Sequence, residues 1–293
     1  MAARQPVAFL PAPAPHWVGD GFRVFPLFAD YAFREEISPF LMLDYAAPHV
    51  FAPRDKPPGV GAHPHRGFET VTIVYDGEIE HRDSAGNSGT IGPGDVQWMT
   101  AGSGLLHEEF HSRAQTKRGG PVSMAQLWVN LPAKDKSAPP AYQTILDGQI
   151  PVVDLGQGRL RVIAGAYAGV KGPARIFSDL HVWDVTLEAD AAAQIAVAAG
   201  DNAMIALFSG AIEIAGHTLD QAGLLMFAPT GDSLDFRVTQ AAKMLVLCGK
   251  PLGEPIAAQG PFVMNTQEEI RQAIADFRAG KMGRPDDFET QGA

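Results

Sequence analysis

Most of this chain alternates between apolar and polar residues with the period of short β-strands. The segment TVTIVYDGEIEHR (residues 70–82) contains two such stretches around an Asp-Gly turn at Asp76-Gly77. GTIGPGDVQWMTAGSG and VSMAQLWVNLP indicate further strands bounded by glycine and proline. The pattern resumes after residue 158 in RLRVIAGAYAG, LHVWDVTLEAD, AMIALFSGAIEIAG, LLMFAPTG and KMLVLCGKP. We therefore predict an all-β fold.

One segment near the C-terminus has a helical pattern instead. TQEEIRQAIADFRAG opens with Thr266 and Glu269 at the spacing of a capping box and ends at Gly280. Its apolar residues recur at i, i+3, i+4 and i+7, which forms a single stripe: Ile270, Ala273, Ile274 and Phe277. The sequence predicts a helix over about residues 267–279.

The two halves of the chain resemble each other. DGEIE (76–80) is followed by GDVQWMTAG (94–102), and SGAIE (209–213) is followed by GLLMFAPTG (223–231). The paired glycines are spaced alike in both copies, which predicts two β-barrels or jelly rolls in tandem. The polar stretch PAKDKSAPPAYQ between them indicates a linker. We expect domains at residues 1–133 and 146–293, joined by a linker at 134–145, with the helix in the second domain.

Composition narrows the class of protein. With 33 acidic and 23 basic residues, the net charge of −10 argues against direct binding to nucleic acid, which needs a basic face. No apolar run approaches the ~20 residues that span a bilayer. The only cysteine, Cys248, excludes an internal disulfide and lies in an apolar strand, where we expect it to be buried. Prolines interrupt the N-terminal segment before a signal-peptide core can form, so we expect a cytoplasmic protein with no membrane partner.

Candidate chemistry begins at AHPHRGFET, residues 62–70. His63 and His65 are two apart, and in an extended chain such residues point to the same face. Pro64 favours an extended backbone and lacks an N–H donor, which places the pair at the edge or entrance of a sheet. Glu69 would follow on the same face if the strand continued without a bulge.

A second pair lies in LLHEEF, about forty residues further on. His107 and Glu109 would share one face of a strand, and Glu108 the other. Three imidazoles and a carboxylate form a mixed nitrogen and oxygen site suited to a divalent first-row metal, iron above all. Zinc is the main competitor, although a structural zinc site normally contains thiolates.

The duplication offers an internal comparison. Counted from the hairpin glycines without gaps, His63 and His65 correspond to Ala196 and Ala198 in the second copy. Counted from the later glycines, His107 and Glu109 correspond to Phe236 and Val238. The count predicts a metal site in the first copy and none in the second.

The segments HPHRGFETVT, PGDVQWMTAGSGLLHEE, QLWVNLP, PFLMLDY and GPFVMNTQEEIRQAI resemble those of the pirin family, within the cupin superfamily. The resemblance implies two tandem cupin barrels of the jelly-roll type and a C-terminal helix. Pirins hold one iron in the N-terminal barrel through three histidines and a glutamate, while the C-terminal barrel is metal-free. Carried over by motif, the metal ligands are His63, His65, His107 and Glu109. Glu69 is placed behind them, where it would orient a histidine, and His49, His81 and His111 are expected at the surface or behind the ligands.

The resemblance also implies an activity. Several bacterial pirins resemble quercetin 2,3-dioxygenases, which open a flavonol ring with dioxygen and release carbon monoxide. Glu109 would then be the catalytic base, and Fe(II) the metal, with zinc, manganese, nickel, cobalt and copper open as alternatives. The rival interpretation is a non-enzymatic, iron-dependent redox sensor that binds a transcription factor or a metabolic enzyme. An open apolar pocket above the metal would favour the enzyme, and a sealed barrel the regulator.

Overall fold

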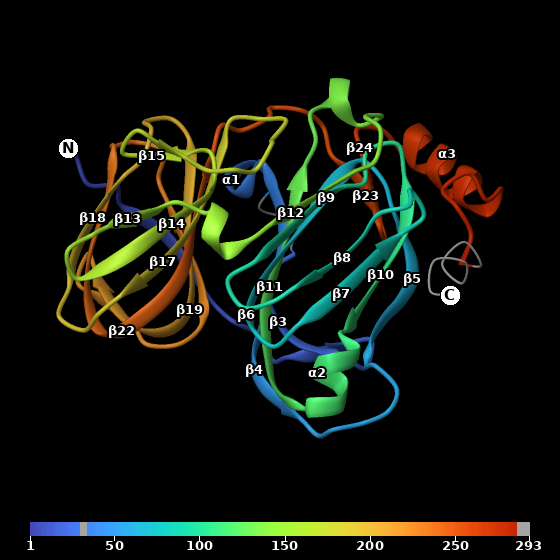
Figure 1. Ribbon diagram of the computed structural model, residues 1–293. Coiled ribbons are helices and arrows are strands. Elements are labelled where there is room, and N and C mark those ends of the chain that lie inside the picture. The colour runs from blue at the N-terminus through green and yellow to red at the C-terminus, as the bar shows by residue number, and fades with distance from the viewer. Residues whose placement is uncertain (30–33, 286–293) are drawn as a thin grey trace. The chain divides into compact units, whose positions relative to one another are not determined.

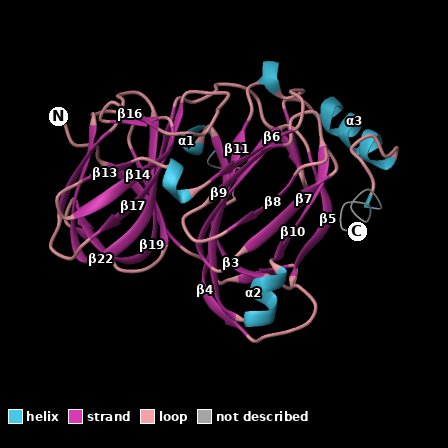
Figure 2. Ribbon diagram, viewed as in Figure 1, coloured by secondary structure: helices cyan, strands magenta, loops and turns pink. Residues whose placement is uncertain are grey.

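The protein consists almost entirely of β-strands, as a computed structural model describes it for residues 1–29 and 34–285 (Figures 1 and 2). Three short α-helices accompany the strands, α1 (Arg34–Ile37), α2 (Arg113–Arg118) and α3 (Gln267–Arg278), with 3₁₀ turns at Ala133–Asp135 and Asp147–Gln149. The all-β prediction and its C-terminal helix are confirmed. No helix in the described part of the chain has the length and apolar character needed to cross a bilayer.

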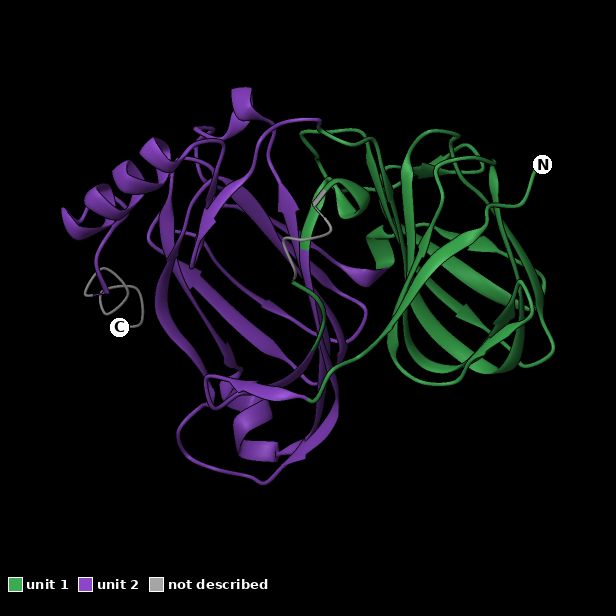
Figure 3. Ribbon diagram, turned by 180° about the vertical axis from the view of Figure 1, so that it is seen from behind, with its two compact units in different colours: residues 1–14, 26–41, 148–252 green, residues 15–25, 42–147, 253–293 purple. Residues whose placement is uncertain are grey.

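The chain forms two compact units, each assembled from separate segments (Figure 3). Unit 1 contains residues 1–14, 26–41 and 148–252, and unit 2 contains residues 15–25, 42–147 and 253–293.

Unit 2 contains a seven-stranded and a four-stranded sheet. The order in the larger sheet is β12 (Ala141–Ile145), β9 (Val96–Thr100), β6 (Phe68–Asp76), β11 (Gly120–Asn130), β4 (Phe40–Phe51), β3 (Phe22–Phe28), β2 (His16–Val18). The order in the smaller sheet is β5 (Gly59–His65), β10 (Leu105–His111), β7 (Ile79–Asp83), β8 (Ser88–Ile91). Val74 and Met124 of the larger sheet share one buried cluster with Ile79 and Ile91 of the smaller. The two sheets therefore pack face to face, and polar groups on their inner faces are shielded from water.

Unit 1 is built on one nine-stranded sheet. Its main path is β1 (Pro6–Pro11), β21 (Gly223–Phe227), β19 (Asn202–Ile214), β22 (Ser233–Gly249), β17 (Leu180–Leu187), β14 (Gly158–Ala164), β13 (Val152–Asp154). Two more strands extend it, β18 (Ala192–Ala196) beside β22 and β20 (His217–Leu219) beside β19. A short hairpin pairs β15 (Ala166–Tyr167) with β16 (Val170–Lys171). The interior is an apolar cluster that includes Cys248, whose predicted burial is confirmed.

The ungapped comparison of the two copies does not hold for strand pairing. In unit 2, His63 lies directly opposite His107. In unit 1, Ala196 lies opposite Ser233, and Phe236 lies opposite Ala193. Strand pairing in unit 1 is therefore shifted by three residues from the pairing that the ungapped count predicts. Phe236 is nevertheless buried in the apolar core of its own unit.

The two units divide the chain differently from the expected domains. Residues 1–14, 26–41 and 253–293 each fall in the other unit, and the expected linker contains a strand of unit 2. Residues 1–14 fall in unit 1, where β1 pairs with β21. Residues 253–293 fall in unit 2, and β12, inside the expected linker, pairs there with β9. That residues 1–133 and 146–293 are the two domains stays a prediction.

The C-terminal segment packs on the unit that carries the histidine motif. It begins with a hairpin, β23 (Ala257–Gln259) and β24 (Phe262–Met264), and continues into α3. Thr266 caps α3 and exchanges hydrogen bonds with Glu269, which confirms the capping box. Ile270 and Ala273 on the buried face of α3 join a cluster that includes Leu106 of β10. The apolar stripe of the helix is thus largely used within its own unit.

A partly buried ion pair ties α3 to the histidine motif. Arg66, next to His65, donates from Nε to the Ser103 carbonyl oxygen at 2.6 Å and from Nη1 to Asp276 at 2.9 Å. Lys281 donates to the other oxygen of Asp276 at 2.8 Å. Hydrogen bonds from Lys281 and Arg66 lower the pKa of Asp276 to about 2.

We expect Asp276→Asn to destabilise the protein by about 2 kcal/mol at pH 7, because it weakens charge-assisted hydrogen bonds. The pKa of Asp276 is lower in the folded than in the unfolded state, so its contribution is complete above about pH 4 and disappears as the pH falls toward 2. Wild type and Asp276→Asn should therefore converge in urea unfolding as the pH drops. Glu268→Gln, which removes an exposed ion pair with Arg271 on the same helix, is the control and should change stability by less than about 0.5 kcal/mol. A constant difference between wild type and Asp276→Asn from pH 7 to pH 2 would contradict the prediction.

Candidate metal centre

Pairing of β5 with β10 brings the two histidine motifs together. His63 lies directly opposite His107, and His65 lies opposite Leu105. β5 is an edge strand of its sheet, which suits Pro64 because proline cannot donate to a second neighbour. The register between the two strands shifts after the His63–His107 pair, because Glu109 lies opposite Val60, so β5 contains one extra residue just before His63.

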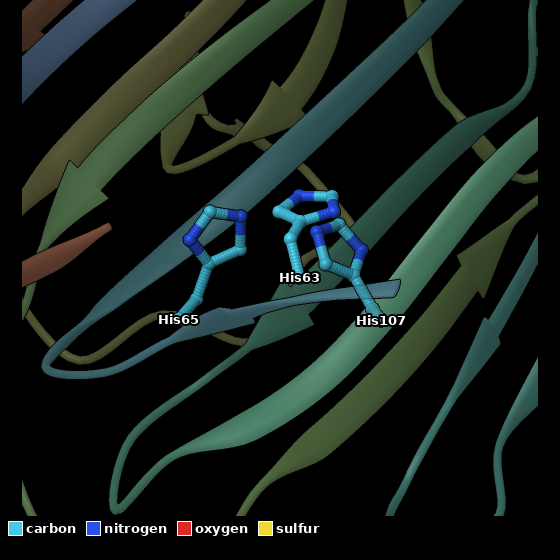
Figure 4. Close-up of side chains that lie close together, drawn as sticks. All are labelled: His63, His65 and His107. Atoms are coloured by element: carbon cyan, nitrogen blue, oxygen red, sulfur yellow. The ribbon is translucent and has the colours of Figure 1, made fainter. Parts of the chain in front are cut away.

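The imidazoles of His63, His65 and His107 converge (Figure 4). One ring nitrogen from each lies within 4.8 Å of the other two. The ring centroids of His63 and His107 are 4.3 Å apart, and His65 is 4.8 Å from each of them. His65 and His107 are buried, whereas His63 is partly exposed. This spacing brings three nitrogens within reach of a single ion.

The ring hydrogens leave a lone pair available on each of the three residues. Nδ1 of His63 lies 2.9 Å from the Gly61 carbonyl oxygen. A carbonyl only accepts, so Nδ1 carries the hydrogen and Nε2 is free to bind a cation. Nδ1 of His65 and Nε2 of His107 are buried without a hydrogen-bond partner among the described residues. Such atoms are costly to bury unless something occupies them, and a metal ion fits both.

Both buried histidines are held neutral, the form that binds metal. Burial lowers the pKa of His65 well below its ordinary value, and the neighbouring His63 lowers it further. Burial does the same to His107, helped by His63, His65 and His81. An uncharged imidazole offers its lone pair without first losing a proton.

Glu109 is the fourth predicted ligand, and its carboxylate is already surrounded by donors. Thr72 and Gln97 donate to Oε1 at 3.1 and 2.9 Å, and Gln126 donates to Oε2 at 2.8 Å. Glu109 forms a second group of close polar atoms with His81 and His107. The structure thus places Glu109 beside His107. That it binds the same cation as the three histidines stays a prediction.

Glu69 lies on β6 and is almost completely buried. It accepts a hydrogen bond from Thr100 Oγ1 at 2.7 Å. Burial raises the pKa of Glu69 to about 7, although the hydrogen bond opposes this. Its expected role behind a histidine stays a prediction.

His81 was expected at the surface or behind the ligands, and the structure places it behind them. It is 1% exposed and contacts Asp83, Gln97 and His107. The sequence contained a signal for its burial. In β7, Ile79, His81 and Asp83 alternate with more exposed residues, so they share the inward face. His111 is also buried, with Nε2 donating to the Gly21 carbonyl oxygen at 2.9 Å.

A small pocket lies beside the site. His63 and Glu109 line it together with Asp44 and Gln126. Burial raises the pKa of Asp44 to about 6. Asp44 and Gln126 could not be recognised from the sequence, because each lies on a strand distant from the histidine motifs. The remaining wall is apolar: Val18, Phe22, Val24, Val60 and Met124.

The fold and the site define a two-barrel cupin protein with a histidine cluster suited to a divalent metal. The chain belongs to the pirin family. The Pirin family model matches residues 21–129, and the model of the pirin C-terminal cupin domain matches residues 182–283. The sequence resemblance to pirins is therefore confirmed.

Known proteins resemble the chain over nearly its whole length. A Pseudomonas aeruginosa protein named "Putative quercetin 2,3-dioxygenase PA2418" is 50% identical over 271 residues, which cover 92% of this chain and 95% of that protein. A pirin-like protein from Caulobacter vibrioides is 39% identical over 83% of this chain and 87% of its own length. The crystal structure of a quercetin 2,3-dioxygenase from Acinetobacter baumannii matches with a TM-score of 0.94 and 46% identity, covering 97% of this chain and 100% of that one.

Proposed function

We propose that this protein is a metal-dependent dioxygenase that cleaves flavonols in the manner of quercetin 2,3-dioxygenases. The observation that carries the proposal is the convergence of three imidazole nitrogens beside a pocket with an apolar wall. The relative named "Putative quercetin 2,3-dioxygenase PA2418" at 50% identity and the structure of a quercetin 2,3-dioxygenase at 46% identity support the substrate class. The apolar wall beside the histidines is the feature that supports the enzyme over the iron-dependent regulator.

His63, His65 and His107 would hold the metal, with Glu109 as the fourth ligand. Fe(II) is our candidate because neutral imidazoles with one carboxylate suit a divalent first-row ion, and zinc, manganese, nickel, cobalt and copper are the alternatives to test. When bound, the cation supplies Lewis-acid and redox chemistry toward the flavonol 3-hydroxyl group and dioxygen.

The pocket residues would bind the substrate and move its proton. Phe22, Val24 and Met124 form the apolar wall against which a planar aromatic molecule would pack. Glu109 faces the same pocket and would accept the proton of the substrate hydroxyl. Gln126 donates to Glu109 Oε2 and so holds the carboxylate in position for this transfer.

Metal removal tests the proposal directly. Protein purified without oxygen, stripped with a chelator and reloaded with Fe(II) or another divalent ion, is mixed with quercetin. We expect at least one reloaded form to consume quercetin, seen as a fall in its absorbance, to take up oxygen and to release carbon monoxide. The stripped protein should do none of these. If every metal-loaded form leaves quercetin intact while metal analysis shows a filled site, the proposed activity is wrong.

A further inference from the structure

A chain of buried polar groups lies behind His107, on the far side from the other two histidines. His81 Nε2 is 3.2 Å from Asp83 Oδ2, and both side chains are fully buried. His81 Nδ1 is 3.3 Å from Gln97 Nε2 and 3.4 Å from His107 Nδ1. β10 runs between β5 and β7, so His107 has His63 opposite it on one side and Asp83 on the other.

The donors and acceptors in this series of polar groups can be assigned by starting from Asp83. A carboxylate accepts, so His81 carries a hydrogen on Nε2 toward Asp83, and its Nδ1 accepts from the Gln97 NH₂ group. Gln97 gives independent support. Tyr142 donates its hydroxyl hydrogen to Gln97 Oε1 at 3.1 Å, which turns the NH₂ group of Gln97 toward His81 Nδ1 and Glu109 Oε1.

The assignment decides the form of His107. Its Nδ1 faces the accepting nitrogen of His81, whose one lone pair it shares with the Gln97 amide, so Nδ1 carries the hydrogen and the unpartnered Nε2 carries the lone pair. It also accounts for the group formed by His81, His107 and Glu109. The Gln97 NH₂ group lies within hydrogen-bond distance of two of these residues, and its hydrogens fill the place that a cation would need.

We propose that His81, backed by Asp83, is a positioning residue that fixes His107 in the Nδ1–H form and thereby sets the metal affinity of the centre. The inference rests on the proposed metal site. Hydrogen bonds of this kind behind a metal ligand typically contribute 10- to 100-fold in affinity.

The positioning group is itself held rigidly. Asp83 Oδ1 accepts from the backbone N–H groups of Ala85 and Asn87 at 2.9 and 3.0 Å. Burial opposes the ionisation of Asp83, but hydrogen bonds from His81 and Asn87 outweigh it and lower the pKa of Asp83. The Tyr142 ring stacks on His81 with centroids 4.7 Å apart and an angle of 18°. His81 therefore has little freedom to turn away from His107.

Two substitutions of His81 separate hydrogen bonding from packing. His81→Leu keeps bulk but removes the acceptor, and we expect it to weaken metal binding about 10- to 100-fold in competition with a chelator. His81→Gln restores an acceptor and should recover part of the loss. His111→Leu is the matched control, since His111 is equally buried in the same unit but hydrogen-bonds only Gly21 among the partners given by the structure, and it should stay near wild type.

A second readout needs neither turnover nor a variant. Long-range ¹H–¹⁵N NMR of the metal-free wild type should show His107 protonated at Nδ1 and His81 at Nε2. His107 protonated at Nε2, unchanged affinity in His81→Leu, or equal losses in the Leu and Gln variants would overturn the inference. The proposed activity is tested separately. A protein that shows these tautomers and affinities but does not cleave quercetin would contradict the proposed activity and leave the positioning role of His81 intact. If His63→Ala left metal affinity unchanged, the metal site itself would be wrong.

Discussion

His107→Ala should eliminate both the bound metal and all flavonol turnover above background. His107 is fully buried on β10 between His63 on one side and Asp83 on the other. Alanine removes the imidazole nitrogen that β10 contributes to the histidine cluster. Metal analysis of the purified variant and quercetin decay under air measure the two effects.

The control for His107→Ala is His111→Ala, four residues later on the same strand. Both histidines are buried, so both variants should lower the midpoint of thermal unfolding through the cavities they create. Only His107→Ala should lose the metal, because the His111 ring packs on Phe22 and Phe51 away from the cluster. Retention of a full complement of metal by a folded His107→Ala variant would remove the basis of the proposed site.

The local geometry of the histidine motifs could be predicted from the sequence because it depends only on strand period. Residues two apart in an extended chain share a face, and this places His63 with His65 whatever the partner strand is. The pairing of the strands could not be predicted in this way. That His63 lies opposite His107 depends on the register between β5 and β10, which local sequence does not specify.

The ungapped residue correspondence between the two copies was wrong for the same reason. A shift of three residues between the two copies leaves every strand recognisable but changes which residues face each other. Local sequence patterns also could not predict that terminal segments belong to units whose strands are distant in sequence. β1 completes the sheet of unit 1, and α3 packs in unit 2, because each buries its apolar side chains on strands distant in sequence.

The polar surroundings of the site were the least predictable part. His81 could have been recognised from its alternation with Ile79 and Asp83. Gln97 and Gln126 have no such signal, since a glutamine on a strand is ordinary until its partner is known. Their partner is Glu109, which each reaches from a different strand of the larger sheet.

Glu109→Gln should lower flavonol turnover by about 10²- to 10⁴-fold, the range expected when a positioned general base is lost. The substitution preserves shape but replaces one acceptor oxygen with an NH₂ donor. Whichever way the new amide turns, that donor faces either Gln126 or the pair Thr72 and Gln97, which are themselves donors. Metal affinity should also fall, because an amide is a weaker ligand than a carboxylate for a divalent ion.

The neighbouring Glu108 provides the matched control for this substitution. It lies one residue away on the same strand but forms an ion pair with Arg82 at 2.8 Å. Glu108→Gln removes the same charge from nearly the same place in the sequence and should leave turnover and metal affinity near wild type. Two outcomes separate the roles of Glu109. If Glu109→Gln loses turnover but keeps its metal affinity, Glu109 is a base and not a ligand. If Glu109→Gln and Glu108→Gln turn over flavonol equally fast, Glu109 takes no part in the chemistry.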